Sequence, residues 1–177
     1  MEFENCLTSR RSIRKYKNEE ISSDVIKKLV RSANLAPSWK NSQVSKFYVA
    51  LSKEQRQKVF DLLPTFNQNN TINASAYIIS TVVDKISGCN KDGSFSQPIK
   101  DGYQYFDNGL QVQNLCLEAT NLGLGTLIMG LFDEQGIRTI FDIPENEKVV
   151  AVISVGYPDI NPTMPTRKPL DEILKIC

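Results

Sequence analysis

Histidine is absent from this sequence of 177 residues. A Ser-His-Asp triad and a Cys-His dyad each use an imidazole as general base, so neither can operate in this protein. Zinc sites also lose the nitrogen ligand that they use most often. The missing imidazole therefore excludes several common catalytic mechanisms.

Cysteine is scarce, and no two cysteines have the CxxC spacing. No apolar run reaches about 18 residues, the length that predicts a membrane-spanning helix, and there is no signal-peptide pattern. We therefore expect a soluble, cytoplasmic chain with no membrane partner. In that compartment the cysteines should be reduced thiols, and Cys116 is expected in the core.

Neither sign of charge dominates, because 21 Lys and Arg stand against 20 Asp and Glu, for a net charge of +1. A dedicated nucleic-acid binder is usually strongly basic, so we expect no nucleic-acid partner. The charge is nevertheless uneven, since residues 1–60 carry 13 of the Lys and Arg but 6 of the Asp and Glu. This favours an anion site near the N-terminus, or complementary surfaces that meet between subunits.

Five cations lie within the eight residues from Arg10 to Lys17. Such a run can be a solvated basic face, a nucleic-acid contact or a pocket for a small dianion such as a phosphate monoester. The planar guanidinium of arginine favours the last interpretation, because it meets phosphate oxygens two at a time. A second basic pair, Arg167-Lys168, adds weight to it.

Helical and strand patterns alternate irregularly, which predicts one α+β domain over residues 1–177, around a mixed central β-sheet. Helices are expected at residues 1–9, from Ser22 to Pro37, from Ser52 to Pro64, from Asp107 to Leu122 and from Asp133 to Phe141. Strands are expected at 46–51, 76–83 and 149–155, with a short apolar segment at 126–131.

Several boundaries carry specific expectations. Ser22 and Asp107 are predicted to cap the helices that follow them, and Gly123 to end a helix in the left-handed conformation. Residues 65–73, with four asparagines and a glutamine, are predicted to form a polar loop. Residues 84–100 are predicted to be a mobile loop or lid, and residues 157–177 a proline-rich C-terminal arm.

The glycines Gly123 and Gly125 invite a dinucleotide-binding interpretation. That fingerprint follows a strand and opens a helix, whereas these glycines follow a helix, so we reject it. They belong instead to an ordered set of short motifs that spans nearly the whole chain. The motifs are Arg10-Arg11-Ser12-Ile13-Arg14, Ala36-Pro37-Ser38-Trp39-Lys40-Asn41-Ser42-Gln43, Gly123-Leu124-Gly125-Thr126, Met129-Gly130, Val155-Gly156-Tyr157-Pro158 and Arg167-Lys168-Pro169-Leu170.

This ordered set resembles the FMN-dependent nitroreductases, as a compact member of that family. The chain departs from the family pattern at Val44-Ser45, where proline and an aromatic residue are common. The resemblance implies a nitroreductase-like fold, with helices flanking the sheet, and a domain-entwined homodimer with FMN at the subunit interface.

The resemblance also implies which residues hold FMN. Arg10, Ser12 and Arg14 would bind the phosphate and ribityl chain, with Arg11 acting partly through its backbone, and Arg167 and Lys168 would close on the phosphate. Pro37, Ser38, Trp39 and Asn41 would come from the partner subunit. Ile128, Met129 and Gly130 would lie against the isoalloxazine ring, and Asn67 and Asn70 would face its pyrimidine edge.

The expected function is that of an FMN-dependent oxidoreductase. NADH or NADPH would donate hydride, and a small-molecule electron acceptor such as a nitroaromatic or a quinone would then be reduced in the same cleft. Such chemistry is centred on the flavin and needs neither a protein nucleophile nor a histidine. The alternative from a different class is a flavin-binding sensor or storage protein without robust turnover.

Overall fold

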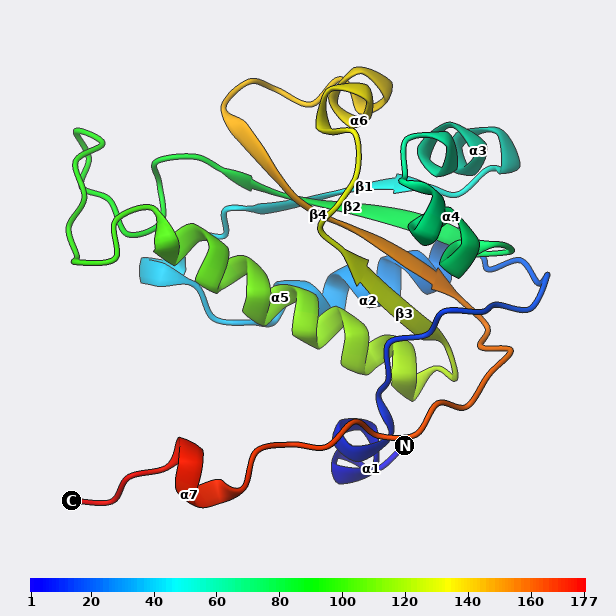
Figure 1. Cartoon of the computed structure of the whole chain (residues 1–177). Coiled ribbons are helices and arrows are strands. Elements are labelled where there is room, and N and C mark those ends of the chain that lie inside the picture. The colour runs from blue at the N-terminus through cyan, green and yellow to red at the C-terminus, as the bar shows by residue number, and fades with distance from the viewer.

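A four-stranded sheet runs through the middle of the protein, which a computed structural model describes over residues 1–177. Its strands are β1 (Ser45–Ala50), β2 (Ala76–Val83), β3 (Gly125–Met129) and β4 (Glu147–Gly156), in the order β1-β2-β4-β3. All three strand pairs are antiparallel. The last strand in the chain therefore lies inside the sheet, between β2 and β3 (Figure 1).

The α+β class is confirmed, but the sheet differs from the expected mixed one. The single parallel pairing is an isolated bridge between Ser12 and Thr126 at the outer side of β3. The apolar run of β2 correctly indicated a strand buried on both faces. The apolar pattern of a strand reports that both of its faces are covered. It does not report whether the neighbouring strands run parallel or antiparallel to it.

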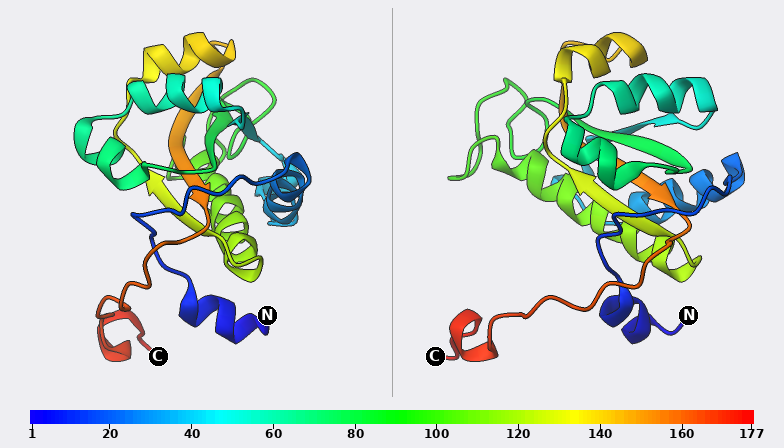
Figure 2. Two further views of the ribbon diagram at one scale, coloured as in Figure 1. Left: turned by 90° about the vertical axis from the view of Figure 1, so that its right-hand side faces the viewer. Right: turned by 45° about the vertical axis from the view of Figure 1, so that its right-hand side comes forward.

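Helices cover both faces of the sheet, so that the protein has three layers (Figure 2). On one face lie α2 (Ser23–Asn34) and α5 (Gly102–Asn121), whose Leu29 and Leu115 are fully buried against Ile78 and Ile153. On the other lie α3 (Lys53–Asp61) and α6 (Glu134–Phe141), which pack on Ile79 and Val152. Adjacent residues of a strand therefore pack into the cores on opposite faces of the sheet, because side chains alternate between the two faces along a strand.

The start signals of two helices are confirmed. The Ser22 hydroxyl accepts a hydrogen bond from Val25 N, and the Ser52 hydroxyl accepts one from Gln55 N. Each satisfies a backbone donor that has no partner within the first turn. Gly123 has φ +75° and ends α5 as expected. Cys116 is buried in the core between α5 and the sheet.

The expected polar loop at 65–73 is wrong for most of its length, because Thr65–Thr71 form the helix α4. Its polar side chains gave no amphipathic signal. They are nevertheless satisfied on folding, since Asn67 and Thr71 are buried and the Thr71 hydroxyl donates to Asn67 O at 2.8 Å. Tertiary packing overrides weak local propensity here.

The start of α5 also differs from expectation. Asp107 is not the cap residue; the helix begins five residues earlier, at Gly102, and Asp107 is buried within it. Its carboxylate accepts hydrogen bonds from a distant segment of the chain instead of from the local backbone. An aspartate that caps a helix and an aspartate that binds a distant segment look the same in the sequence, so the sequence pattern could not distinguish them.

Two segments lie outside these layers. Residues 84–101, hereafter the 84–101 segment, contain turns and one isolated bridge between Cys89 and Phe95, but no helix or strand. The chain after Gly156 extends away from the sheet and carries only the single-turn helix α7 (Leu170–Ile173), none of whose residues is buried. The N-terminal helix α1 (Phe3–Ser9) lies beneath the sheet (Figure 1). No helix has the combined length and apolar character needed to cross a bilayer.

Candidate functional site

The basic segment 10–14 lies along the free side of β3. Ile13 N donates to Thr126 O at 2.9 Å, and Ser12 forms the parallel bridge with Thr126. Gly125 permits this approach, because a Cβ on that residue would lie 2.8 Å from Ile13 Cβ. Cβ atoms in proteins do not approach each other so closely, so the basic segment can lie against β3 here only because residue 125 is a glycine.

Tyr16 fixes the other end of this segment. Its buried hydroxyl lies 2.9 Å from Ser154 Oγ and donates to Ile13 O at 3.0 Å. Burial raises the pKa of Tyr16 well above its ordinary value, so the phenol remains protonated as a hydrogen-bond donor. Arg14, between these two anchors, is exposed and free to face a ligand.

A cleft of about 320 Å³ opens beside Arg14. Three parts of the chain line it: the basic segment, α4, and the end of β3 with the turn that follows. The lining residues are Arg14, Phe66, Asn67, Asn70, Leu127, Ile128, Met129, Gly130 and Leu131. Six of them were predicted from the sequence, and Phe66, Leu127 and Leu131 were not, although each is a sequence neighbour of a predicted residue.

The cleft combines an apolar wall with a few polar groups. Ile128 leaves half of its surface exposed on this side, and a Cβ at Gly130 would meet no atom within 4 Å. The Asn67 amide donates to Leu131 O at 3.1 Å and so holds α4 against the turn after β3. One N–H of that amide remains for a ligand, and Asn70 is half-buried beside it.

Arg10 and Arg11 have different surroundings from Arg14. The Arg11 guanidinium donates to Thr8 O at 2.7 Å and to Arg10 O at 2.8 Å, next to the C-terminus of α1. Its Nε is buried without a partner. Burial raises the pKa of the Cys116 thiol, an effect opposed by a hydrogen bond with Thr126 and by the charge of Arg10. Of the three arginines, Arg14 is the one that lines the cleft.

The other predicted contacts, from residues 37–41, lie beside the start of α5 and do not line this cleft. The short 3₁₀ helix η1 (Trp39–Asn41) sits beside the start of that helix, where Trp39 N donates to Asp107 at 3.0 Å (Figure 1). Within one chain, Pro37, Ser38, Trp39 and Asn41 do not line the cleft at Arg14.

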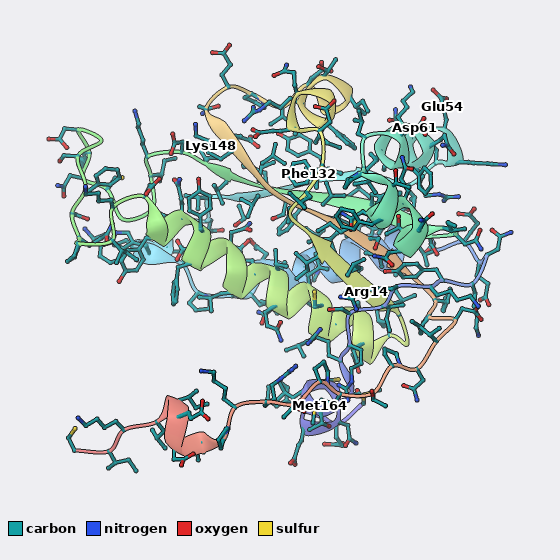
Figure 3. All side chains as sticks on the ribbon, viewed as in Figure 1. Arg14, Glu54, Asp61, Phe132, Lys148 and Met164 are labelled. Atoms are coloured by element: carbon teal, nitrogen blue, oxygen red, sulfur yellow. The ribbon has the colours of Figure 1, made fainter.

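Arg167 and Lys168 lie on the extended arm. Arg167 donates to Pro165 O at 3.2 Å and Lys168 forms an ion pair with Glu172, so both contacts stay within the arm. Figure 3 shows Met164, on the same arm, well away from Arg14. Within one chain the two basic clusters do not meet, and their convergence remains a prediction for an assembly of two chains.

A second hollow, of about 260 Å³, lies between α3 and the residues after α4. Its central cation is already engaged, because Arg56 binds both oxygens of Glu20 and donates to Leu51 O and Ser75 O. The hydrogen bond from Arg56 lowers the pKa of the Glu20 carboxyl. This hollow contains none of the predicted site residues, and Lys53 is its other cation.

Comparison with known proteins gives a consistent result. A family model described as the nitroreductase family matches residues 7–157. A protein of Archaeoglobus fulgidus, provisionally named an NADH dehydrogenase/NAD(P)H nitroreductase, is 34% identical, and the match covers 88% of this chain and 87% of that protein.

Solved structures have the same fold. A nitroreductase family protein of Clostridium novyi NT matches with a TM-score of 0.77 at 27% identity, over 97% of this chain and 91% of the other. A provisionally named nitroreductase of Exiguobacterium sibiricum, solved in complex with FMN, matches with a TM-score of 0.86 at 24% identity, over 100% and 98% of the two chains. The nitroreductase-like fold expected from the sequence is thereby confirmed.

Proposed function

Since the chain belongs to the nitroreductase family, we propose that it is an FMN-dependent NAD(P)H oxidoreductase that reduces small acceptors such as nitroaromatics or quinones. The observation that carries the proposal is the cleft, where Arg14, the Asn67 and Asn70 amides and the apolar end of β3 converge from three separate parts of the chain.

The residues of the cleft fit an isoalloxazine ring. Ile128, Met129 and Gly130 offer an apolar surface with open space for a planar group, while the two amides offer donors at its side. When bound, FMN supplies the redox chemistry, since it accepts hydride from a nicotinamide and passes electrons to an acceptor. Donors along one edge of the ring stabilise the negative charge of its reduced form.

Arg14 would hold the phosphate or the ribityl chain, with Ser12 and Arg10 alongside. The anchors on either side of this segment, Ile13 on Gly125 and Tyr16 on Ser154, fix the backbone from which Arg14 projects. Arg167 and Lys168 would add cations from the arm, whose helix α7 has no buried residue.

The site would be completed by a second copy of the chain. The cleft of about 320 Å³ is at the small end of the roughly 300–1,000 Å³ typical of ligand pockets. The predicted contacts at 37–41 do not line this cleft in the same chain. Exposed apolar residues on α1, α5 and the arm, such as Phe3, Phe106 and Ile173, would be covered in a homodimer.

The absorption spectrum of the purified protein, followed by anaerobic titration with NADH and then NADPH, tests the proposal. We expect a yellow protein whose flavin absorption is bleached by at least one nicotinamide and restored by a nitroaromatic or a quinone. A colourless protein that takes up no added FMN would refute it. A yellow protein that neither nicotinamide bleaches would instead favour a flavin sensor or store.

A further inference from the structure

Asp107 is a buried carboxylate that receives hydrogen bonds from two separate segments. It is 2% exposed. From residues 38–43 it accepts hydrogen bonds from Trp39 N, at 3.0 and 3.2 Å to its two oxygens, and from Ser42 Oγ at 3.2 Å. From the 84–101 segment it accepts one from Ser87 Oγ at 2.6 Å. No lysine or arginine forms a salt bridge with it, so these neutral donors alone satisfy its charge.

Residues 38–43 need such an anchor because their backbone is strained. Lys40, Asn41 and Gln43 have φ of 46°, 56° and 48°, in the left-handed region that residues with a Cβ adopt rarely. Local bonds contribute, since Gln43 N donates to Ser38 Oγ and Ser42 N donates to Trp39 O. The bonds that tie this turn to the rest of the protein are those to Asp107.

The 84–101 segment touches the same place in a second way. Ser87 is fully buried, and its neighbour Gly88 packs against Tyr103. The ring of Tyr103 in turn lies 4.4 Å from that of Trp39, centroid to centroid. A displacement of Ser87 would therefore disturb both the carboxylate and the aromatic pair that hold Trp39.

We propose that Asp107 is a positioning residue that couples the 84–101 segment to the turn at residues 38–43, through its hydrogen bonds with Ser87, Ser42 and Trp39. This inference rests on the proposed function, in which Ser38, Trp39 and Asn41 contact the flavin of the partner subunit. The 84–101 segment then controls flavin affinity although Ser87 does not itself touch the flavin. A change that displaces Ser87 shifts the Trp39 turn and weakens the neighbouring subunit's hold on FMN.

Ser87→Ala is the decisive variant, because it removes one donor to Asp107 and leaves the carboxylate in place. Ser94→Ala is its matched control, since Ser94 is exposed and bonds only to Asn90 and Asp92 within the same segment. Two quantities are measured: the FMN dissociation constant, by flavin fluorescence, and amide hydrogen exchange of residues 38–43, by mass spectrometry on apoprotein.

For Ser87→Ala we expect the FMN dissociation constant and the exchange rate of residues 38–43 each to rise about tenfold, the effect of losing one hydrogen bond to a charged group. Ser94→Ala should change neither. Asp107→Ala should exceed Ser87→Ala in both. Asp107→Asn should restore most of the protection, because its amide oxygen can still accept from Trp39 N.

Exchange at residues 38–43 that is the same in Ser87→Ala as in the wild type would overturn the coupling, and so would an equal acceleration in Ser94→Ala. If the wild type takes up no FMN, the proposed function fails. The exchange comparison would still decide whether Ser87 and residues 38–43 are coupled, because it needs no flavin. Should Asp107→Ala fail to fold, Ser87→Ala alone carries the test.

Discussion

Arg14 is the one residue of the basic run that both lines the cleft and is free of strong contacts with its own chain. Its only hydrogen bond is a long one, 3.4 Å to Ser12 O, whereas the Arg11 guanidinium donates to Thr8 O and Arg10 O at the C-terminal end of α1. The sequence shows five similar cations within eight residues and cannot rank them. Their ranking depends on which carbonyls and core residues lie nearby after folding.

Replacing Arg14 and Arg167 together by alanine should yield colourless apoprotein. A hydrogen bond to a charged group contributes about 1.5–3 kcal/mol, so loss of both should weaken FMN binding by at least about a hundredfold. Flavin content after purification and the dissociation constant measure the effect, with Lys27→Ala on the exposed face of α2 as control. Full FMN retention by the double variant would contradict the phosphate assignment.

Two buried tyrosines should make the protein sensitive to alkali. Burial raises the pKa of Tyr77 to about 12 and also raises that of Tyr16. Below about pH 10 each phenol is protonated in the folded and unfolded states alike, and stability is unaffected. Above pH 10 the unfolded chain releases protons that the folded chain keeps, so stability falls as the pH rises towards 12.

Urea unfolding between pH 9 and pH 11.5 measures this loss. Tyr77→Phe should lessen the fall of the unfolding free energy by up to about 1.4 kcal/mol per pH unit, because one proton fewer is released on unfolding. Tyr105→Phe, at an exposed tyrosine, should leave the fall unchanged. An unaltered fall in Tyr77→Phe would show that its phenol ionises as readily in the folded protein as in the unfolded chain.

At the scale of helices and strands, most elements could be predicted because their signals are local. Ser22 and Ser52 mark helix starts, Gly123 marks a helix end, and the β-branched run at 76–83 marks β2. The helix α4 could not be predicted in this way. Its polar residues are accommodated by distant partners, such as Leu131 O for Asn67, and distant partners leave no periodic trace in the sequence.

Gly125→Ala tests how β3 positions the basic segment. The new methyl group would meet Ile13, so the protein must either accept strain of about 1–3 kcal/mol or let residues 10–14 move off the strand. We expect a lower unfolding free energy together with weaker FMN binding. In Gly125→Ala/Ile13→Ala the space is restored, and FMN binding should recover more than stability does. Binding at wild-type strength in Gly125→Ala would separate the segment's position from the flavin site.

At the scale of the whole molecule, the site residues fall into two groups that share no cleft within one chain, the second of them beside the start of α5. Arg14 belongs to the first group and Asn41 to the second, which meets Asp107 near the start of that helix. The sequence motifs predicted both groups but not their separation, because spacing along a chain does not report distance in space. A homodimer that joins the first group of one subunit to the second group of its partner would bring them together.

Mixed dimers of Arg14→Ala and Asn41→Ala chains test this arrangement directly. Each variant alone should bind FMN weakly at both sites. If each site combines the two groups across the interface, a mixed dimer has one site that carries both substitutions and one site that carries neither. Mixing should therefore restore strong FMN binding at one site per mixed dimer. Titration with FMN after unfolding and joint refolding gives the stoichiometry. No recovery on mixing would place Arg14 and Asn41 in the site of the same subunit.

The interior position of β4 has a consequence for how the protein is made. Because this last strand pairs with β2 on one side and β3 on the other, the sheet cannot close while the ribosome still holds residues 147–156. Until β4 is released, the apolar strand β2 has one unpaired edge, and such a strand is prone to aggregate. Newly made chains should therefore depend on molecular chaperones until residues 147–156 have left the ribosome.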